Sequence, residues 1–208
     1  MDWKSLLSNH SKDINQHNIL NTNAETGEKA SLFLKNKAVC TQESGYILVE
    51  GPDAEVFLQG QVTCDVSNVV QGASVNGAHL NPQGKVIFSF LLSKLKKGLI
   101  ILDVNKPILA TALSSLEKYA VFSKVTLSIS ENFYSFLISS KANDDLPKLT
   151  EYSSIQKLSK GIFYSIVPKT LFSKWFDLIK DDIMLIHNDT SRYIRINACL
   201  LYTSDAAD

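Results

Sequence analysis

The chain has 208 residues, of which 45% are hydrophobic, and this is enough for a packed core in one large or two small domains. Its 21 basic and 21 acidic residues balance, so the overall charge gives no argument for binding to nucleic acid or to an anionic membrane. No apolar run approaches the roughly 18 to 20 residues that cross a bilayer, and the N-terminus has no signal-peptide core, so we expect a cytoplasmic protein that does not enter a membrane.

The first part of the chain differs in pattern from the part that follows. Residues 1–40 are polar and rich in Asn, Ser and Lys, which is typical of a loosely held segment ahead of a domain. Residues 41–130 show strand and helix periodicity in turn, with turn residues between the elements. The predicted elements are a strand over 45–51, a helix that begins at Asp53 as cap or first-turn acid, two strands around a turn at 81–84, a third strand over 99–104, a helix that begins at Pro107 and a strand over 124–129. This β-α-β-β-β-α-β order predicts an α+β unit related to the ferredoxin-like fold.

The turn of the predicted hairpin carries the most specific chemistry. Its residues are Asn81-Pro82-Gln83-Gly84, where proline fixes one φ angle and Gly84 can adopt the positive φ that a side chain resists. Lys85 then leaves the turn at a defined place, where its ammonium group can meet an anion. The alternative for Lys85 is a solvated turn lysine. Asn81 is expected to stabilise the turn.

A second, smaller α+β unit is predicted over 131–198. Its elements are strands over 133–139, 163–167 and 183–186 and a helix over 170–180, with a charged loop over 141–149. We expect this unit to be incomplete. The last ten residues, 199–208, have the character of translated sequencing-adapter read-through, and we exclude them from the interpretation of the fold. The three cysteines have no metal-type spacing and are expected to be buried free thiols.

Three segments together resemble the folate-binding proteins of the YgfZ type, relatives of the aminomethyltransferase (T protein) of glycine cleavage. They are VEGPDAEVFLQGQVTCDV (49–66), the hairpin turn with Asn81, Gly84 and Lys85, and LEKYAVFSKVTL (116–127). RYIRINA (192–198) resembles the segment shortly before the cysteine signature K-G-C-Y-x-G-Q-E of this family, which the chain lacks. The resemblance therefore implies a C-terminally truncated fragment without the third, barrel domain of the family.

The resemblance also implies a T-protein-like fold and tetrahydrofolate as cofactor, with 41–130 as the first folate-binding domain. The candidate cofactor-binding residues are Lys85, Gly84, Asn81, Gln61, Thr63, Asp65, Tyr46 and Tyr193. The two tyrosines stand two residues from Ser44 and Ser191, where a tryptophan is usual in the family. From the residues alone, Gln59, Gln61, Thr63 and Asp65 either line a polar ligand cavity or end the first helix, and both interpretations stay open. His79 is interpreted as a hydrogen-bonded strand histidine rather than a base.

Three functions follow as hypotheses. The first is a monomeric accessory protein that binds tetrahydrofolate and supports iron–sulfur enzymes, including those that modify tRNA. The second is a folate-dependent one-carbon transferase. The T protein has an acidic pair just after its hairpin turn, whereas this chain has Phe88 and Ser89, neither of which accepts a proton at neutral pH. An enzyme of that kind is therefore disfavoured. The third hypothesis is a structural fragment that binds no folate.

Overall fold

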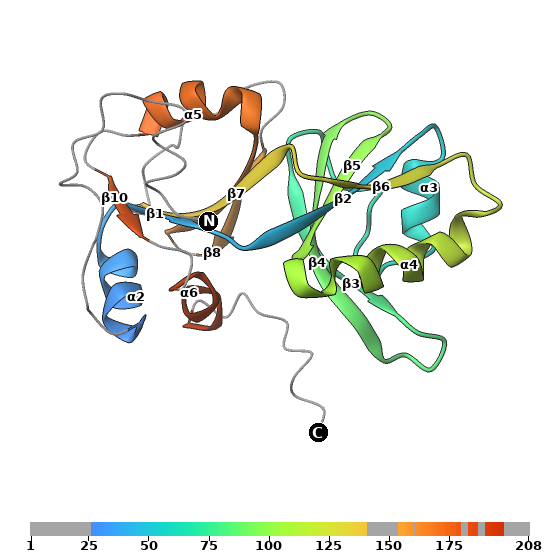
Figure 1. The fold of residues 1–208 in the computed structure, drawn as a ribbon, viewed down its shortest axis with the longest axis horizontal. Coiled ribbons are helices and arrows are strands. Elements are labelled where there is room, and N and C mark those ends of the chain that lie inside the picture. Colours follow the sequence, from blue (N-terminus) through green and yellow to red (C-terminus); the bar gives the residue numbers. More distant parts are fainter. Residues whose placement is uncertain (1–25, 141–153, 160, 180–182, 187–189, 198–208) are drawn as a thin grey trace. The chain divides into compact units, whose positions relative to one another are not determined.

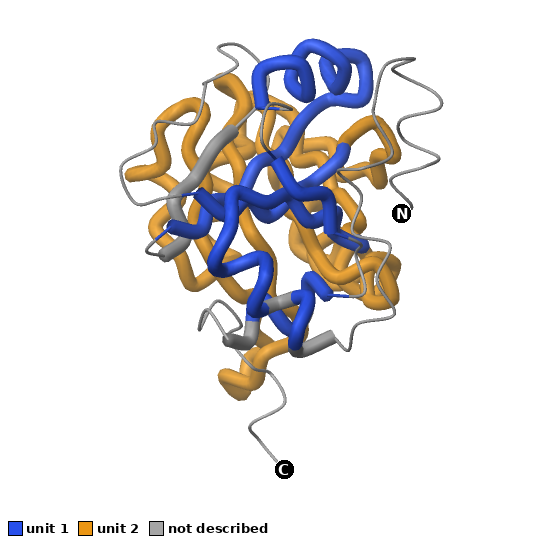
Figure 2. The backbone as a smooth tube through the Cα atoms, turned by 90° about the vertical axis from the view of Figure 1, so that its left-hand side faces the viewer, with its two compact units in different colours: residues 1–43, 134–149, 155–201 blue, residues 44–133, 150–154, 202–208 orange. Residues whose placement is uncertain are grey.

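The computed structural model describes residues 26–140, 154–159, 161–179, 183–186 and 190–197 (Figure 1). The chain divides into two compact units (Figure 2). Of the described residues, unit 2 contains the continuous segment Ser44–Phe133 together with Ser154, and the others belong to unit 1. None of the helices in these described ranges is long and apolar enough to span a membrane.

Unit 2 is a five-stranded antiparallel sheet with two helices, as the sequence predicts. Its strands lie in the order β3-β4-β5-β2-β6. Along the chain the elements are β2 (Ser44–Glu50), α3 (Ala54–Gln59), β3 (Ser74–Leu80), β4 (Val86–Lys96), β5 (Leu99–Asn105), a 3-10 turn (Lys106–Ile108), α4 (Leu109–Ala120) and β6 (Thr126–Ser130). The β-α-β-β-β-α-β order and the α+β class are thereby confirmed.

The core of unit 2 lies between one face of the sheet and the two helices. Alternate strand residues point into it, and it contains Ile47 and Val49 of β2, Phe88, Phe90 and Leu92 of β4, Phe57 and Leu58 of α3, and Ala112 and Leu116 of α4. Gly45 allows α4 to approach β2 closely, because a Cβ atom there would lie 2.8 Å from Cδ2 of Leu109. The period-2 pattern of the strands therefore decides which face the helices cover.

Asp53 joins the beginning of α3 to the segment that follows α4. It occupies the N-cap position of α3, but its side chain makes no capping hydrogen bond. Instead, Oδ2 accepts a hydrogen bond of 2.8 Å from the main-chain N–H of Lys124, 71 residues further along the chain. A second close approach lies beside it, because a Cβ atom on Gly51 (φ 132°) would meet the Lys124 carbonyl oxygen. Asp53, predicted as a cap or first-turn acid, thus accepts a hydrogen bond from a segment that is distant in the sequence.

Unit 1 is a second five-stranded sheet, in the order β10-β1-β7-β9-β8. Along the chain its elements are α2 (Thr26–Lys35), β1 (Ala38–Thr41), β7 (Phe133–Ser139), β8 (Ser154–Ser159), β9 (Ile162–Pro168), a 3-10 turn (Lys169–Leu171), α5 (Phe172–Ile179), β10 (Met184–Ile186) and α6 (Ser191–Asn197). Strand β1 pairs antiparallel with β7 and parallel with β10. Of the predicted polar segment 1–40, residues 26–40 thus include a helix and a fully buried strand, while residues 1–25 lie outside the described ranges.

Helices lie on both faces of the unit 1 sheet (Figure 1). On one face α5 packs through Trp175, whose ring stacks on Phe136 with 4.3 Å between centroids. On the other face Phe33 of α2 and Ile194 of α6 pack against Leu137. Cys40 and Cys64 are buried free thiols, as predicted, whereas Cys199, the 141–149 loop and the 199–208 segment lie outside the described residues.

Candidate functional site

The β3–β4 turn has the conformation that its sequence predicts. Gly84 has φ 80°, and its N–H donates to the Asn81 carbonyl oxygen at 2.9 Å. The Asn81 side-chain oxygen accepts hydrogen bonds from the main-chain N–H groups of Gln83 (3.0 Å) and Lys85 (2.9 Å). The turn-stabilising interpretation of Asn81 is therefore confirmed. Lys85 is exposed, so its backbone is fixed while its ammonium group is in solvent.

The segment after α3 is bonded to the edge of β3. The Thr63 N–H donates to the carbonyl oxygen of Ala78, and the Ala78 N–H donates to Oγ1 of Thr63, both at 3.0 Å. Val62 forms a bridge with His79 just beside this pair. Two hydrogen bonds to one residue of an edge strand hold the loop in register. The Thr63 hydroxyl oxygen is thus an acceptor in the fold, and its own O–H is left to donate elsewhere.

Asp65 organises the next turn of the same loop. Its carboxylate accepts hydrogen bonds from the hydroxyl and N–H of Ser67 and from the side-chain amide of Asn68. The Ser67 hydroxyl is the main cause that holds the pKa of Asp65 below its usual value. Gln59 acts in a similar way, since its side-chain oxygen accepts from the N–H of Val66 at 2.7 Å. These polar side chains therefore shape the end of the helix and its loop.

His79 is the chemically unusual residue of this region. It is 2% exposed, and its Nδ1 lies 2.7 Å from the main-chain oxygen of Gln61. A carbonyl oxygen only accepts, so Nδ1 carries the proton and, in the neutral imidazole, Nε2 is an acceptor. Nε2 is buried and has no hydrogen-bond partner in the structure. The ring packs against Phe88 at 5.4 Å and stands edge-on to Tyr119 at 6.1 Å. The prediction of a hydrogen-bonded strand histidine is confirmed.

A pocket of about 340 Å³ lies between this loop, the end of β3 and α4. It is lined by Gly60, Gln61, Val62, Thr63, His79, Leu80, Asn81, Pro82 and Tyr119. Three of the predicted site residues, Gln61, Thr63 and Asn81, are brought together here. His79 and Tyr119 were not predicted for the site. The sequence does hold one signal for His79. It is a polar residue at a position of β3 that faces the core, where the paired residues of β4 are apolar.

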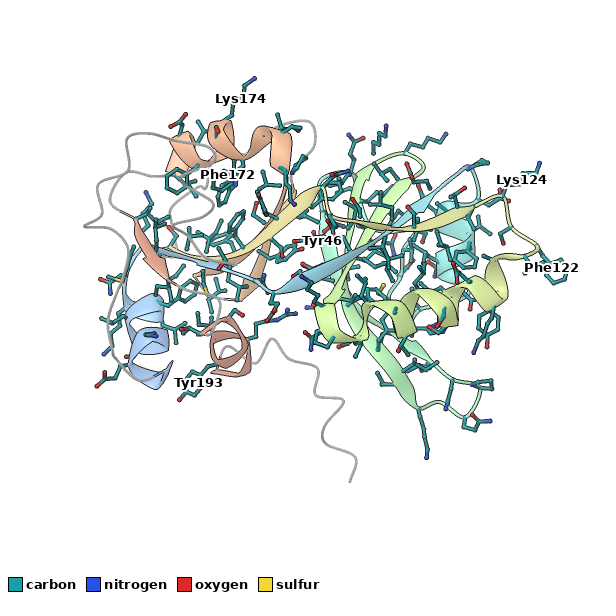
Figure 3. The ribbon with its side chains drawn as sticks, viewed as in Figure 1. Tyr46, Phe122, Lys124, Phe172, Lys174 and Tyr193 are labelled. Carbon is teal, nitrogen blue, oxygen red and sulfur yellow. The ribbon has the colours of Figure 1, made fainter. Side chains whose placement is uncertain are left out.

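The other predicted residues lie elsewhere. Gly84, Lys85 and Asp65 are not part of the pocket lining. Tyr46 of β2 points away from α4, because its neighbour Ile47 faces the helices, and it is buried against Phe133 with 5.8 Å between ring centroids (Figure 3). Tyr193 is on α6 of unit 1 and is 41% exposed (Figure 3).

Phe88 and Ser89, the positions where the resemblance leads one to expect the acidic pair, face opposite sides of the sheet. Phe88 pairs with His79 in the ladder and is buried beside it in the core of unit 2. Ser89 pairs with Ala78, so its side chain is on the face away from α3 and α4. Neither residue supplies a carboxylate, and the polar groups of the pocket are amides, hydroxyls and one imidazole. The pocket is therefore suited to bind through neutral hydrogen bonds.

The sequence was compared with protein families and with known proteins. No protein-family model matches the chain. It is 32% identical over 136 residues to the tRNA-modifying protein YgfZ of Aliivibrio fischeri (strain MJ11), covering 65% of this chain and 42% of that protein. It is 41% identical over 88 residues to the tRNA-modifying protein YgfZ of Hamiltonella defensa, covering 42% of this chain and 26% of that protein. These matches thus span less than half the length of the curated relatives.

A solved structure shows the same fold. The glycine cleavage system aminomethyltransferase T from Bartonella henselae matches with a TM-score of 0.67 and 16% sequence identity, covering 85% of this chain and 55% of that one. At this identity the likeness concerns the fold alone. It confirms the expectation of a T-protein-like α+β architecture.

Proposed function

Because this chain is a relative of the YgfZ type of protein, with the fold of the glycine cleavage T protein, we propose that it binds tetrahydrofolate and supports iron–sulfur enzymes, including those that modify tRNA. It does so as a cytoplasmic monomer. The observation that carries the proposal is the pocket beside the hairpin, where residues of the family-like segments line one cavity together with His79. The matches cover less than half the length of these relatives, so the activity of a whole YgfZ protein is proposed for this chain and is not shown by the comparison.

The residues of the pocket fit the pterin head of a folate. A pterin is a flat heterocycle that carries N–H donors, and His79, which lines the pocket, has one unpaired ring nitrogen, Nε2. The side-chain amide of Gln61 and the hydroxyl of Thr63 add hydrogen-bonding groups at the same wall. Tyr119, which is 44% exposed, offers an aromatic face. Outside the pocket, the ammonium group of Lys85 can attract the carboxylates of the folate tail.

The geometry favours holding the cofactor over transferring a group from it. Bound tetrahydrofolate would supply a carrier for one-carbon units. Proton transfer to or from a folate nitrogen needs an acid or base, and in this chain Phe88 is packed in the core while Ser89 has only a hydroxyl. Under this proposal the residues of the pocket bind and orient the cofactor. The one-carbon transferase remains the alternative function.

A tetrahydrofolate titration followed by calorimetry tests the proposal. We expect Gln61→Ala to weaken binding, because the substitution removes the pocket amide while the main-chain oxygen that holds His79 stays in place. Gln83→Ala is the matched control, since Gln83 is exposed on the turn and does not line the pocket. If the unmodified chain gives no binding heat, or if both variants lose affinity equally, the proposal is wrong.

An aminomethyl-transfer assay separates the two functions. The unmodified chain is expected to be inactive, because it has no carboxylate at the positions of Phe88 and Ser89. Ser89→Asp introduces an acid on the sheet face away from the helices and therefore away from the pocket, so this variant is expected to stay inactive as well. Robust activity of the unmodified chain would establish the transferase and overturn the accessory function.

A further inference from the structure

The two edges of the unit 2 sheet differ. Strand β3 forms one edge and β6 forms the other. The β3 edge is covered, because Thr63 exchanges two hydrogen bonds with Ala78, and its ladder is irregular between His79 and Leu80. At the other edge Thr126–Ser130 pairs with β2, and within the described part of the chain no strand lies on its outer side. A row of main-chain N–H and C=O groups is therefore left without a strand partner.

Strand β6 lacks the features that usually protect an edge from pairing. Its sequence, Thr-Leu-Ser-Ile-Ser, contains no charged residue and no proline, and its ladder with β2 runs without a shift in register. Leu127 and Ile129 are on the sheet face that carries the helices, and Ile129 is 46% exposed. The other face carries only hydroxyl side chains, those of Thr126, Ser128 and Ser130. The edge is thus open, regular and uncharged.

The pattern of β6 is complementary to itself. In an antiparallel two-fold pair centred on Ser128, Leu127 lies opposite Ile129 of the second copy, and Thr126 lies opposite Ser130 of the second copy. Apolar side chains then meet on one face and hydroxyl groups meet on the other, which are favourable cross-strand pairs. A slip by one residue would set apolar side chains against hydroxyl groups, because side chains alternate between faces. The pair also covers the exposed side of Ile129.

The charges at the two ends of β6 match an antiparallel partner. Lys124 is exposed just before the strand, and Glu131 is exposed just after it (Figure 3). Among the described residues neither side chain forms an ion pair. In the antiparallel pair the beginning of each strand lies beside the end of the other, so Lys124 is near Glu131 of the second copy at both ends. A parallel pair would bring like charges together. The charges therefore select the antiparallel direction.

We propose that β6 is an interface for a second copy of this chain, which joins the two unit 2 sheets into one continuous sheet. One short strand from each copy gives an interface below the roughly 1,200 Å² of stable complexes, so the pair forms only as the concentration rises. The inference goes beyond the accessory role proposed above, which stays with the monomer. Because the pocket is at the β3 edge, pairing at β6 leaves it open, and the two proposals stand or fall separately.

Sedimentation velocity of the full chain tests the pairing. The chain is expected to be a monomer at about 5 µM and to show a rising fraction of dimer above about 50 µM. A chain that stays monomeric up to about 500 µM would overturn the proposal. Tetrahydrofolate binding is measured separately on the same samples, so a failure of one proposal is not mistaken for a failure of the other.

Variants of Ser128 test the position of the interface. Ser128→Lys and Ser128→Glu each place two like charges opposite one another across the two-fold axis, so each variant alone should associate at least about tenfold more weakly. An equimolar mixture brings an ammonium group opposite a carboxylate and should restore the dimer, which also shows that both variants fold. Asn76→Lys is the matched control, because Asn76 is exposed on the covered strand β3, and it should associate like the unmodified chain. Single variants that pair as strongly as the unmodified chain, or a mixture that stays monomeric, would contradict an interface at β6.

Discussion

Nδ1 of His79 lies 2.7 Å from the main-chain oxygen of Gln61, and this contact joins the core-facing side of β3 to the loop after α3. It fixes both the position of the loop and the tautomer of the ring. The same loop and strand end supply most of the pocket lining, so the shape of the pocket depends on this hydrogen bond together with the two between Thr63 and Ala78.

The tautomer is the most direct prediction. Because Nδ1 donates to a carbonyl oxygen, neutral His79 is expected to carry its proton on Nδ1 and to have an unprotonated Nε2. Long-range 1H–15N spectra of the histidine rings distinguish the two nitrogens. A neutral ring with the proton on Nε2 would contradict the structure.

His79→Phe is expected to destabilise unit 2 by about 1–3 kcal/mol, since the ring volume is kept but the Gln61 oxygen loses its donor. Urea unfolding measures the change. Tyr119→Phe is the control, because it keeps the ring that stands edge-on to His79 and removes an oxygen from a half-exposed side chain. Its effect should stay within about 0.5 kcal/mol.

Gly77→Ala tests the packing under β3. The added Cβ would lie 2.7 Å from Cζ of Phe90 and 2.8 Å from Sγ of Cys64, both inside the core. Overpacking of this kind costs about 1–3 kcal/mol, and we expect that loss in the free energy of unfolding. At Gly60 the nearest atom would be 3.6 Å away, so Gly60→Ala should be close to neutral. Equal effects of the two substitutions would show that the space around Gly77 is not filled as described.

Asp53→Ala is expected to cost about 0.5–2 kcal/mol, because it removes the acceptor for the Lys124 N–H. Asp53→Asn keeps an oxygen at that place and should retain most of the stability. Thermal unfolding of both variants gives the comparison. If asparagine is as damaging as alanine, the hydrogen bond is not the cause.

The pH dependence of Asp65 follows from its hydrogen bonds. Its pKa in the folded chain is lowered from the ordinary value of 3.8, chiefly by the Ser67 hydroxyl. A lowered pKa means that the ionised form stabilises the fold, with this contribution present above pH 3.8 and lost as the pH falls through the native pKa. Ser67→Ala should raise the pKa of Asp65 toward 3.8, as measured by 13C titration of the carboxyl carbon. A pKa that stays in place would show that another contact holds it down.

The next prediction concerns Lys85 and the tail of the folate, which would lie outside the pocket. An exposed ammonium group adds little to binding, so Lys85→Ala should weaken the binding of tetrahydrofolate by about three- to fivefold. Lys97→Ala is the matched control, since Lys97 is also exposed, on the β4–β5 turn. Binding that is unchanged by Lys85→Ala would place the tail of the ligand away from the hairpin.

The fold of unit 2 could be predicted because its signals are local. Strand alternation, Pro107 before a helix and the turn residues around Gly84 are all contained in a continuous segment. Strand β1 could not be recognised in the same way. It has only four residues, and its partners Met184 and Ser139 are more than ninety positions away in the sequence, so nothing near it in the chain marks it as a strand.

The candidate site was predicted in part for the same reason. Gln61, Thr63 and Asn81 follow the ends of elements that the pattern had already located, so their proximity could be inferred. The role of His79 depends on the Gln61 oxygen 18 residues before it and on the ring of Tyr119 on a distant helix. Tyr46 was assigned from resemblance, and only the pleat of β2 shows that it faces away from the pocket.

The division of the chain has a consequence for its biosynthesis. Apart from Ser154, the described part of unit 2 is one inserted segment, and the strands on either side of it, β1 and β7, are paired from Thr41 and Phe136 back to Ala38 and Ser139. The inserted segment can therefore form all of its ladders on the ribosome while four of the five strands of the unit 1 sheet, β7 to β10, are still untranslated. Its completion then brings β1 and β7 side by side, which lowers the loop-closure entropy that the later sheet has to overcome. The inner unit can thus be complete before the outer unit, although the chain of the outer unit begins first.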